Sequence, residues 1–453
     1  RFWSRADTYW NARGGSQVDG GAFLYSVSPG GTGMDITCTD KFGRTLVLPT
    51  RTPAFSRNGK SVSPPSLDIP QLPMDQLFAW YKDQVCQWDY ARYNVFLRWL
   101  EDHPRRGGAW SELLDILTLM MDRRYDTGEL RRSSLLSLID QAFSRVAGEI
   151  KVSPPGGFDY HQHGDAIPPE PRHGQAILLD ASGFTPQDET SLAREVQRLY
   201  DQGYKHFVII NTEGHRFIAN GLGANTVGIR IDVYGSPGDY LASGVDGLEI
   251  HVHNNGQDQL AQIMKSGKLV VHGDVGQTFM YAAKGGEVYV LGNTAGRPLI
   301  NAVGKPRVVI NGTCLDYLAE SFMAGDPLNG GGFVVLNGLA FDEHNQIIEL
   351  DTPYPGGNLF SLASGGAIFV RDPHGRVTSD QLNGGEFALL TAQDWQLVEP
   401  YLLENERLFD IPLDDLLTVD GKLRAPADVY RKIQPRALRA LQAEEAWVTA
   451  EDD

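Results

Sequence analysis

A segment of about 20 residues repeats along the middle of the chain, and this repeat restricts the possible folds more than any other feature. Each copy contains a short aliphatic stretch that ends at a common frame position, which is glycine in most copies. The frame positions 235, 254, 273 and 292 lie 19 residues apart, the next step is 20 residues, and two later steps are lengthened by insertions. A fixed period of this size is typical of solenoids, in which each repeat forms one coil.

Two positions in every copy are aliphatic without exception. They lie two and four residues before the frame position, so their side chains share one face of a strand. The nearer position holds Val233, Val252, Val271, Val290, Ile310, Leu336 and Val370, and the farther one holds Ile231, Ile250, Leu269, Val288, Val308, Val334 and Ile368. A third apolar column, six residues after the frame, contains Leu241, Leu260, Phe279 and Leu318. These columns predict a mainly β protein built on a parallel β-helix of about seven coils.

Glycines recur at two places in the repeat, where each coil is expected to turn. The structural turns are assigned to Gly235, Gly273, Gly292, Gly312 and Gly338 at the frame, and to Gly267, Gly286, Gly332 and Gly366 six residues before it. The step from 338 to 372 is 34 residues long, which predicts an excursion from one coil.

The segments around the repeat predict a multi-domain chain. We expect a strand and turn region at 1–70, an aromatic-rich helical domain at 71–150, a Pro/Gly-rich linker at 151–175, a β-α-β cap at 176–228, the β-helix at 229–375 and a C-terminal helical extension at 376–453. The cap is expected to cover the first coil, because a bare coil would expose an edge strand.

Composition excludes several classes of function. The net charge of −17 disfavours nucleic acids and anionic membranes as partners. No stretch approaches the roughly 18 apolar residues of a membrane span, so a cytoplasmic protein is expected. The three cysteines (Cys38, Cys86 and Cys314) lie far apart, which excludes a self-contained four-cysteine iron–sulfur or zinc site.

Histidines provide the weak candidates for a metal site. His161 and His163 form an H-x-H pair, with His173 nearby, but the surrounding prolines and glycines lack the rigid support that metal ligands need. His253 and His272 are expected to stack in successive coils about 4.8 Å apart. Metal binding by this second pair is possible, but we expect neutral side-chain stacking instead.

The position just before the frame is expected to form an outward or polar ladder on the β-helix. It holds Tyr234, His253, His272, Leu291, Asn311, Asn337 and Arg371. A carbohydrate-active enzyme on such a surface needs clustered acidic residues, and Asp232 has no second carboxylate stacked beside it. This enzyme class and a metal-binding module at His161 and His163 remain the alternatives, and no catalytic residue is assigned.

Several of these motifs resemble the GXGXG domain over about residues 176–375. The resemblance is carried by the segments 208–222, 233–240, 271–276 and 284–293. That domain is the C-terminal domain of the large subunit of glutamate synthase. It also occurs as a separate subunit of glutamate-synthase-like complexes and of formylmethanofuran dehydrogenase. The resemblance implies a right-handed β-helix with a structural role and no catalytic residues. It also implies no cofactor in this chain, but FMN and iron–sulfur clusters in partner subunits, beside a glutaminase-like subunit. The first 170 residues, the C-terminal helices and the His253–Asn254 pair at one frame position depart from the pattern.

Overall fold

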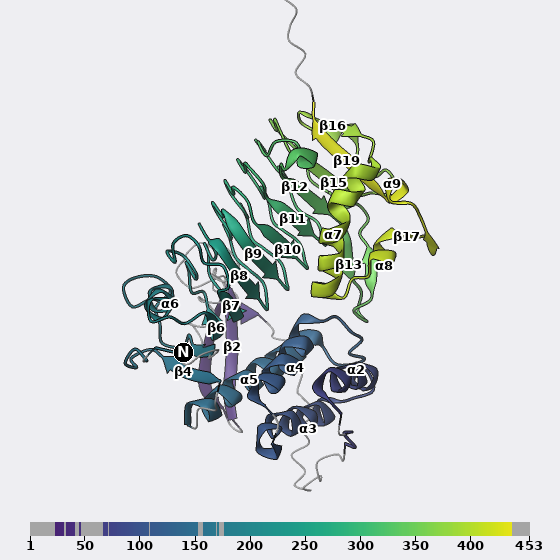
Figure 1. The fold of residues 1–453 in the computed structure, drawn as a ribbon. Helices are drawn as coiled ribbons and strands as arrows, with labels where there is room; N and C mark the ends of the chain where they lie inside the picture. The colour runs from purple at the N-terminus through teal and green to yellow at the C-terminus, as the bar shows by residue number, and fades with distance from the viewer. Residues whose placement is uncertain are drawn as a thin grey trace, which may run out of the picture.

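The structure is a computed structural model, and a stack of parallel strands forms its centre (Figure 1). It describes residues 23–30, 33–40, 45–46, 67–70, 72–107, 109–152, 157–168, 170–171 and 176–436. Near the N-terminus, β1 (Phe23–Gly30), β2 (Gly33–Asp40) and β3 (Thr45–Leu46) form a small antiparallel sheet of their own. Within the described residues, no helix combines the length and apolar character that crossing a bilayer would require.

The main sheet has twelve strands, and ten of them follow one another in parallel along the stack. In order these are β4 (Phe158–Gln162), β5 (Ala176–Asp180), β6 (His206–Glu213), β7 (Arg230–Ser236), β8 (Asp246–Val252), β9 (Ser266–Val271), β10 (Glu287–Val290), β11 (Arg307–Ile310), β12 (Phe333–Leu336) and β15 (Ala367–Arg371). Strand β19 (Tyr430–Pro435) pairs antiparallel with β15 and then with β16 (Gly385–Ala388), which closes the far end. The predicted parallel β-solenoid of about seven coils is confirmed.

The register of the strands is the one that the aliphatic columns predict. Val271 of β9 lies opposite Val290 of β10 and Val252 of β8, and the other column members pair in the same way. All fourteen residues of the two columns, and the four of the third column, have no exposed surface. They form one continuous apolar interior that runs the length of the solenoid.

The frame glycines are required by how closely successive coils approach. A Cβ atom on Gly292 would lie 2.2 Å from a side-chain oxygen of Asp274 in the preceding coil, and one on Gly273 would lie 2.3 Å from an oxygen of Asn255. Those same oxygens accept backbone N–H groups of the next coil, so each glycine leaves room for a hydrogen bond between coils.

The segment expected to cap the first coil is part of the sheet. Strands β5 and β6 continue the parallel register, and the cap's helix α6 (Leu192–Asp201) packs Leu192, Val196 and Leu199 into the end of the solenoid interior. Strand β4 extends the sheet further, although it lies inside the range that was expected to be a linker. The edge strand at this end is therefore β4, which the Pro/Gly-rich composition around it concealed.

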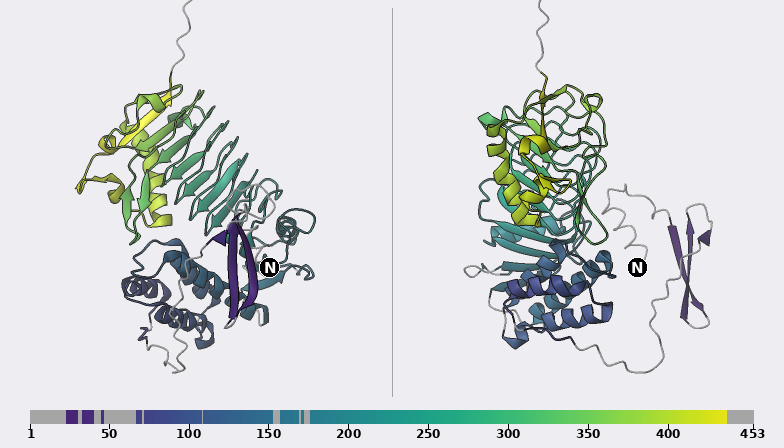
Figure 2. Two further views of the ribbon diagram at one scale, coloured as in Figure 1. Left: turned by 180° about the vertical axis from the view of Figure 1, so that it is seen from behind. Right: turned by 90° about the vertical axis from the view of Figure 1, so that its right-hand side faces the viewer.

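Two helical layers cover the outer face of the main sheet (Figures 1 and 2). The first consists of α2 (Met74–Val85), α3 (Tyr90–Glu101), α4 (Trp110–Asp122) and α5 (Arg132–Val152), and it packs on Leu178, Val208, Ile210 and Tyr234. The second consists of α7 (Ala392–Phe409) and α8 (Leu413–Leu417), and it packs on Val270, Tyr289, Val309, Val335 and Phe369. The face that carries the expected ladder is therefore buried beneath the two layers. The expectation that it points outward was wrong, because residues far away in sequence cover it.

The remaining elements are short. The long excursion forms a hairpin of β13 (Leu339–Phe341) and β14 (Ile347–Glu349), and β17 (Thr418–Val419) pairs with β18 (Lys422–Leu423). Short 3₁₀ turns occur at Pro104–Arg106, Pro327–Asn329 and Ser379–Gln381. The C-terminal extension, expected to be helical, contains the helices α7, α8 and α9 (Pro426–Val429), but its described part ends in the strand β19.

One corner of the coils has a backbone conformation that the sequence pattern did not indicate. Residues at alternate positions have positive φ angles although they are not glycine, as in Gln259 (φ 58°), Ala261 (54°) and Ile263 (51°). The N–H of Ala261 donates to Leu241 of the preceding coil, whereas the N–H groups of Gln259 and Ile263 donate to Gln277 and Tyr281 of the next coil. Alternating handedness thus directs hydrogen bonds to both neighbours, and this offsets the steric cost.

Replacing Ile263 with asparagine is expected to stabilise the protein. A β-branched residue is strongly disfavoured at positive φ, and 46% of the Ile263 surface is exposed, so little packing is lost. Asn301 occupies the equivalent corner position at φ 55°. We expect the free energy of unfolding to rise by about 1 kcal/mol in urea titrations. Ile263→Val keeps the β-branch and should show no gain; an equal gain in both variants would contradict this explanation.

Candidate functional site

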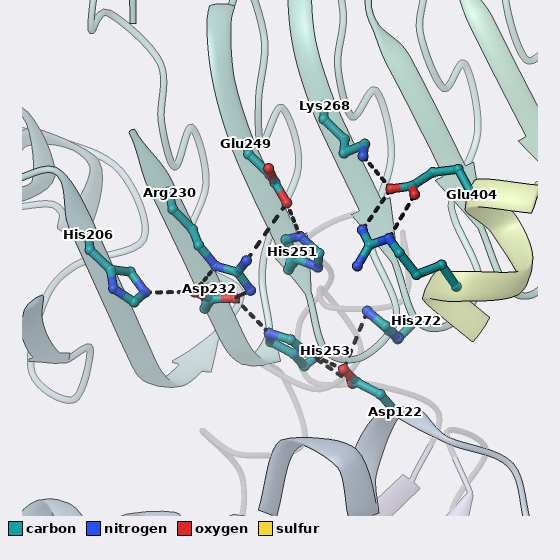
Figure 3. Close-up of polar contacts among 11 residues, drawn as sticks. Asp122, His206, Arg230, Asp232, Glu249, His251, His253, Lys268, His272 and Glu404 are labelled. Carbon is teal, nitrogen blue, oxygen red and sulfur yellow. Dashed lines mark hydrogen bonds and ion pairs between the residues drawn. The ribbon is translucent and has the colours of Figure 1, made fainter. Parts of the chain in front are cut away.

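A cluster of histidine and carboxylate side chains lies on the outer face of the sheet, where the two helical layers meet (Figure 3). His253 and His272 directly follow β8 and β9, and their rings stack with centroids 5.3 Å apart. Asp122, the last residue of α4, reaches them from the first helical layer. Phe409 at the end of α7 covers the ring of His272 edge-on. The site therefore combines three parts of the chain that are distant in sequence.

His253 lies between two buried carboxylates. Its Nδ1 is 2.9 Å from Oδ2 of Asp122, and its Nε2 is 3.2 Å from Oδ1 of Asp232. Burial by itself lowers the pKa of this imidazole, but the two aspartates outweigh burial and raise the pKa to about 9. The predicted stack with His272 is confirmed, whereas the expectation of a neutral pair is wrong for His253, because each of its nitrogens meets a carboxylate.

Asp232 is held in place by further basic groups on neighbouring strands. Arg230 donates two hydrogen bonds of 2.8 Å to its two oxygens, and Nε2 of His206 lies 3.0 Å away. Burial favours the protonated form of Asp232, but these hydrogen bonds together with His253 hold its pKa well below the usual range. Asp232 is therefore a fixed negative charge beneath His253.

His272 differs from its neighbour because it has no hydrogen bond. Its side chain is 5% exposed, and neither ring nitrogen has a hydrogen-bond partner among the described residues. Nε2 lies 3.4 Å from Oδ2 of Asp122 without forming a hydrogen bond. Burial lowers the pKa of His272 to about 3, and Asp122 opposes this effect only in part. A neutral, buried imidazole with two unused nitrogens is thus directed into the cluster.

This arrangement offers three ligand atoms of the kinds that bind divalent transition metals. One atom each from Asp122, His253 and His272 lies within 4.8 Å of the others, and all three residues are buried. The sequence pattern identified the two histidines but not Asp122, which lies 131 positions before His253. One sequence feature could have indicated that this face is covered. Val270, Tyr289 and Val309 lie between the inner columns and are apolar, and a strand that is apolar on both faces is covered on both faces.

The other histidine candidates are not brought together. His161 lies in β4 and is buried, with Nε2 2.7 Å from Oε1 of Glu195. His163 is exposed, and its ring contacts Phe184 edge-on. No metal-binding group among the described residues includes either histidine. His173 lies outside the described residues.

A separate cavity of about 500 Å³ lies between α5 and the ends of β6 and β7. Its lining includes Asp140, Ser144 and Asn211, and the hydroxyl of Ser144 lies 3.0 Å from the side-chain oxygen of Asn211. The carboxyl group of Asp140 has no hydrogen-bond or ion-pair partner within the described part of the chain. Burial raises its pKa to about 6.

Asp140 is expected to make stability depend on pH in the acidic range. Its pKa is about 6 in the folded protein and about 3.8 for an unperturbed aspartate, so the folded state holds this proton more tightly than the unfolded chain does. The resulting contribution to the free energy of unfolding is complete below about pH 4 and is lost as the pH rises through 6. Asp140→Asn should therefore be more stable than the wild type at pH 7, by about 1–3 kcal/mol, and equally stable near pH 4.

Urea titrations at the two pH values measure this difference. The exposed Asp83 on α2 provides the matched control, because Asp83→Asn should change stability at neither pH. A gain for Asp140→Asn that is the same at both pH values would contradict the assignment.

The chain is thus a parallel β-solenoid with helical layers on its outer face. A buried histidine–aspartate cluster lies where these layers meet the solenoid. Residues 207–396 match the protein family described as GXGXG motif, so the resemblance to this family is confirmed for the solenoid. The matched range contains His253 and His272, whereas Asp122 lies before it. No curated protein matches the chain.

Proposed function

We propose that the chain is a structural, non-catalytic subunit of a multi-subunit redox or amidotransfer complex related to glutamate synthase or formylmethanofuran dehydrogenase. The observation that carries this proposal is the match of the solenoid to the GXGXG motif family. In this proposal the chain positions catalytic partners, namely a glutaminase-like subunit and a subunit with FMN and iron–sulfur clusters, in the cytoplasm. The chain itself holds neither of these cofactors.

The architecture suits such a role. Ten parallel strands at the usual spacing of about 4.8 Å span roughly 40 Å, which is long enough to separate two catalytic centres. The apolar interior is continuous, and β4 and the β19–β16 pair end the sheet on either side. Such a rod resists bending, so partners bound at different coils would keep a fixed distance.

The outer face of the sheet does not favour the alternative of a carbohydrate-active enzyme. Asp232 is buried beneath α4 and bonded to Arg230 and His253, so it is not available to a glycan. Along the same face, α7 covers the later coils. The metal-binding alternative is not supported either, because no cluster of metal-binding groups among the described residues includes His161 or His163.

Native purification tests the proposal. A tagged chain produced at its natural level should co-purify, in fixed stoichiometry, with a glutaminase-like protein and a flavin or iron–sulfur protein, identified by mass spectrometry. The tag alone, expressed in the same cells, is the control. Elution of the chain by itself, or with carbohydrate-processing proteins only, would contradict the proposal.

A further inference from the structure

We infer that Asp122, His253 and His272 form a binding site for one divalent transition-metal ion, which joins the first helical layer to the solenoid. The site goes beyond the scaffold role, and its test does not depend on which partners the chain has. Two of the ligands come from successive coils and the third from the end of α4, so a bound ion would connect the two parts of the molecule.

Two of the three separations between the ligand atoms suit a small divalent ion. Oδ2 of Asp122 lies 2.9 Å from Nδ1 of His253 and 3.4 Å from Nε2 of His272. Ligands bound to one ion at about 2.1 Å are separated by roughly 3.0 Å in an octahedron and roughly 3.4 Å in a tetrahedron. The two separations therefore correspond to edges of such a coordination shell, and Asp122 can offer its second oxygen as well.

The absence of hydrogen bonds to His272 in the described part of the chain supports the metal site independently of these distances. This side chain is 95% buried, and yet neither of its nitrogens has a hydrogen bond within the described residues. A buried imidazole without partners is costly, and a metal bond would use the lone pair of Nε2. The guanidinium group of Arg123 also lies near His272. It donates a hydrogen bond to the backbone carbonyl of Arg407.

The surroundings of His253 match those of a histidine ligand. Metal-bound imidazoles usually donate their second ring N–H to a carboxylate, which fixes the ring and makes the other nitrogen more basic. Asp232 stands in that position, 3.2 Å from Nε2, and is itself held by Arg230 and His206. His253 can thus bind the ion through Nδ1, with Asp232 as its support.

The donor set indicates which ions would bind. Two imidazoles and a carboxylate favour Zn²⁺ and related first-row ions over Ca²⁺ or Mg²⁺, which prefer oxygen ligands. The site is enclosed by Phe409 and by the two helical layers, so a structural role suits it better than an open catalytic one.

Metal titration of the full chain tests this inference. The protein is first stripped of metal with a chelator, then mixed with Zn²⁺ and dialysed. It should retain one Zn²⁺ per chain and have a higher Tm than the metal-free protein. Co²⁺ should produce visible absorption bands of a nitrogen- and oxygen-ligated ion. Mg²⁺ at the same concentration should do neither.

His272→Leu is the decisive variant, because Leu291 occupies the same column position in the next coil and is fully accommodated there. It should fold, should be at least as stable as the metal-free wild type, and should bind Zn²⁺ at least 100-fold more weakly. His272→Gln is a second variant that keeps a polar side chain and should show the same loss. His163→Ala, at the exposed histidine, should bind like the wild type.

Three results would overturn the inference. The first is a wild-type chain that retains no Zn²⁺ after dialysis and shows no shift in Tm. The second is wild-type affinity in both His272 variants. The third is loss of binding in His163→Ala, which would place the ion in the region of β4.

Discussion

Replacing Val271 with aspartate is expected to prevent the solenoid from folding. Val271 has no exposed surface and lies between Val252 and Val290 in adjacent strands of the apolar interior. A carboxylate there would have neither water nor a cationic partner, because its neighbours in the column are aliphatic. The loss of stability should exceed about 5 kcal/mol, which is comparable to the whole stability of many domains. Circular dichroism and thermal melting of the purified variant measure the effect.

Val227→Asp is the matched control for this substitution. It makes the same chemical change at a position that is 82% exposed, shortly before β7. This variant should fold with an unchanged Tm. A soluble Val271→Asp protein that melts at the wild-type temperature would show that the strand register described above is wrong.

Replacing Asp122 with alanine is expected to produce the second largest effect. The substitution removes one of the two carboxylates that hold His253 and leaves a buried imidazolium only partly compensated. Breaking a buried ion pair on one side typically costs about 3–5 kcal/mol. The loss should appear in urea titrations of metal-free protein, and hydrogen exchange should increase first at the end of α4.

Asp126→Ala is the control for this second variant. Asp126 lies four residues later and pairs with His344 of the excursion on the exposed surface, at 3.4 Å. Because water competes for exposed ion pairs, this variant should stay close to the wild type. Equal destabilisation of both variants would mean that the buried cluster does not hold the helical layer in place.

The interior of the solenoid could be predicted from the sequence because it depends on local repetition. Residues such as Val252, Val271 and Val290 recur at a fixed spacing, and stacking in register is the way to bury all of them together. The third column around Leu260 was found for the same reason. The left-handed corner at Ala261 and Ile263 was not found, since it is stabilised by hydrogen bonds between coils rather than by the residue types themselves.

The outer face of the sheet could not be predicted in the same way. Whether His253 and His272 are exposed depends on α4 and α7, which are separated from them by more than a hundred residues along the chain. Periodicity contains no information about such contacts. Strand β4 was missed because prolines and glycines surround it, although His161 within it is buried against Glu195.

The histidine–aspartate cluster and the proposed scaffold role concern different parts of the molecule. The apolar interior makes the rod, and the cluster at Asp122 fixes the first helical layer to it. We expect partner subunits to contact surfaces that these layers leave free. The first helical layer lies before the family match, which covers residues 207–396.

We propose that this chain positions redox or amidotransfer partners and contains none of their cofactors. The most direct measurement is the content of flavin and acid-labile sulfide in the native complex and in this chain after it has been separated from its partners. We predict that flavin and sulfide remain with the partners and that the isolated chain, folded as judged by its Tm, contains neither. Flavin or an iron–sulfur cluster bound to the isolated chain, or a native chain that never forms a complex, would contradict the account.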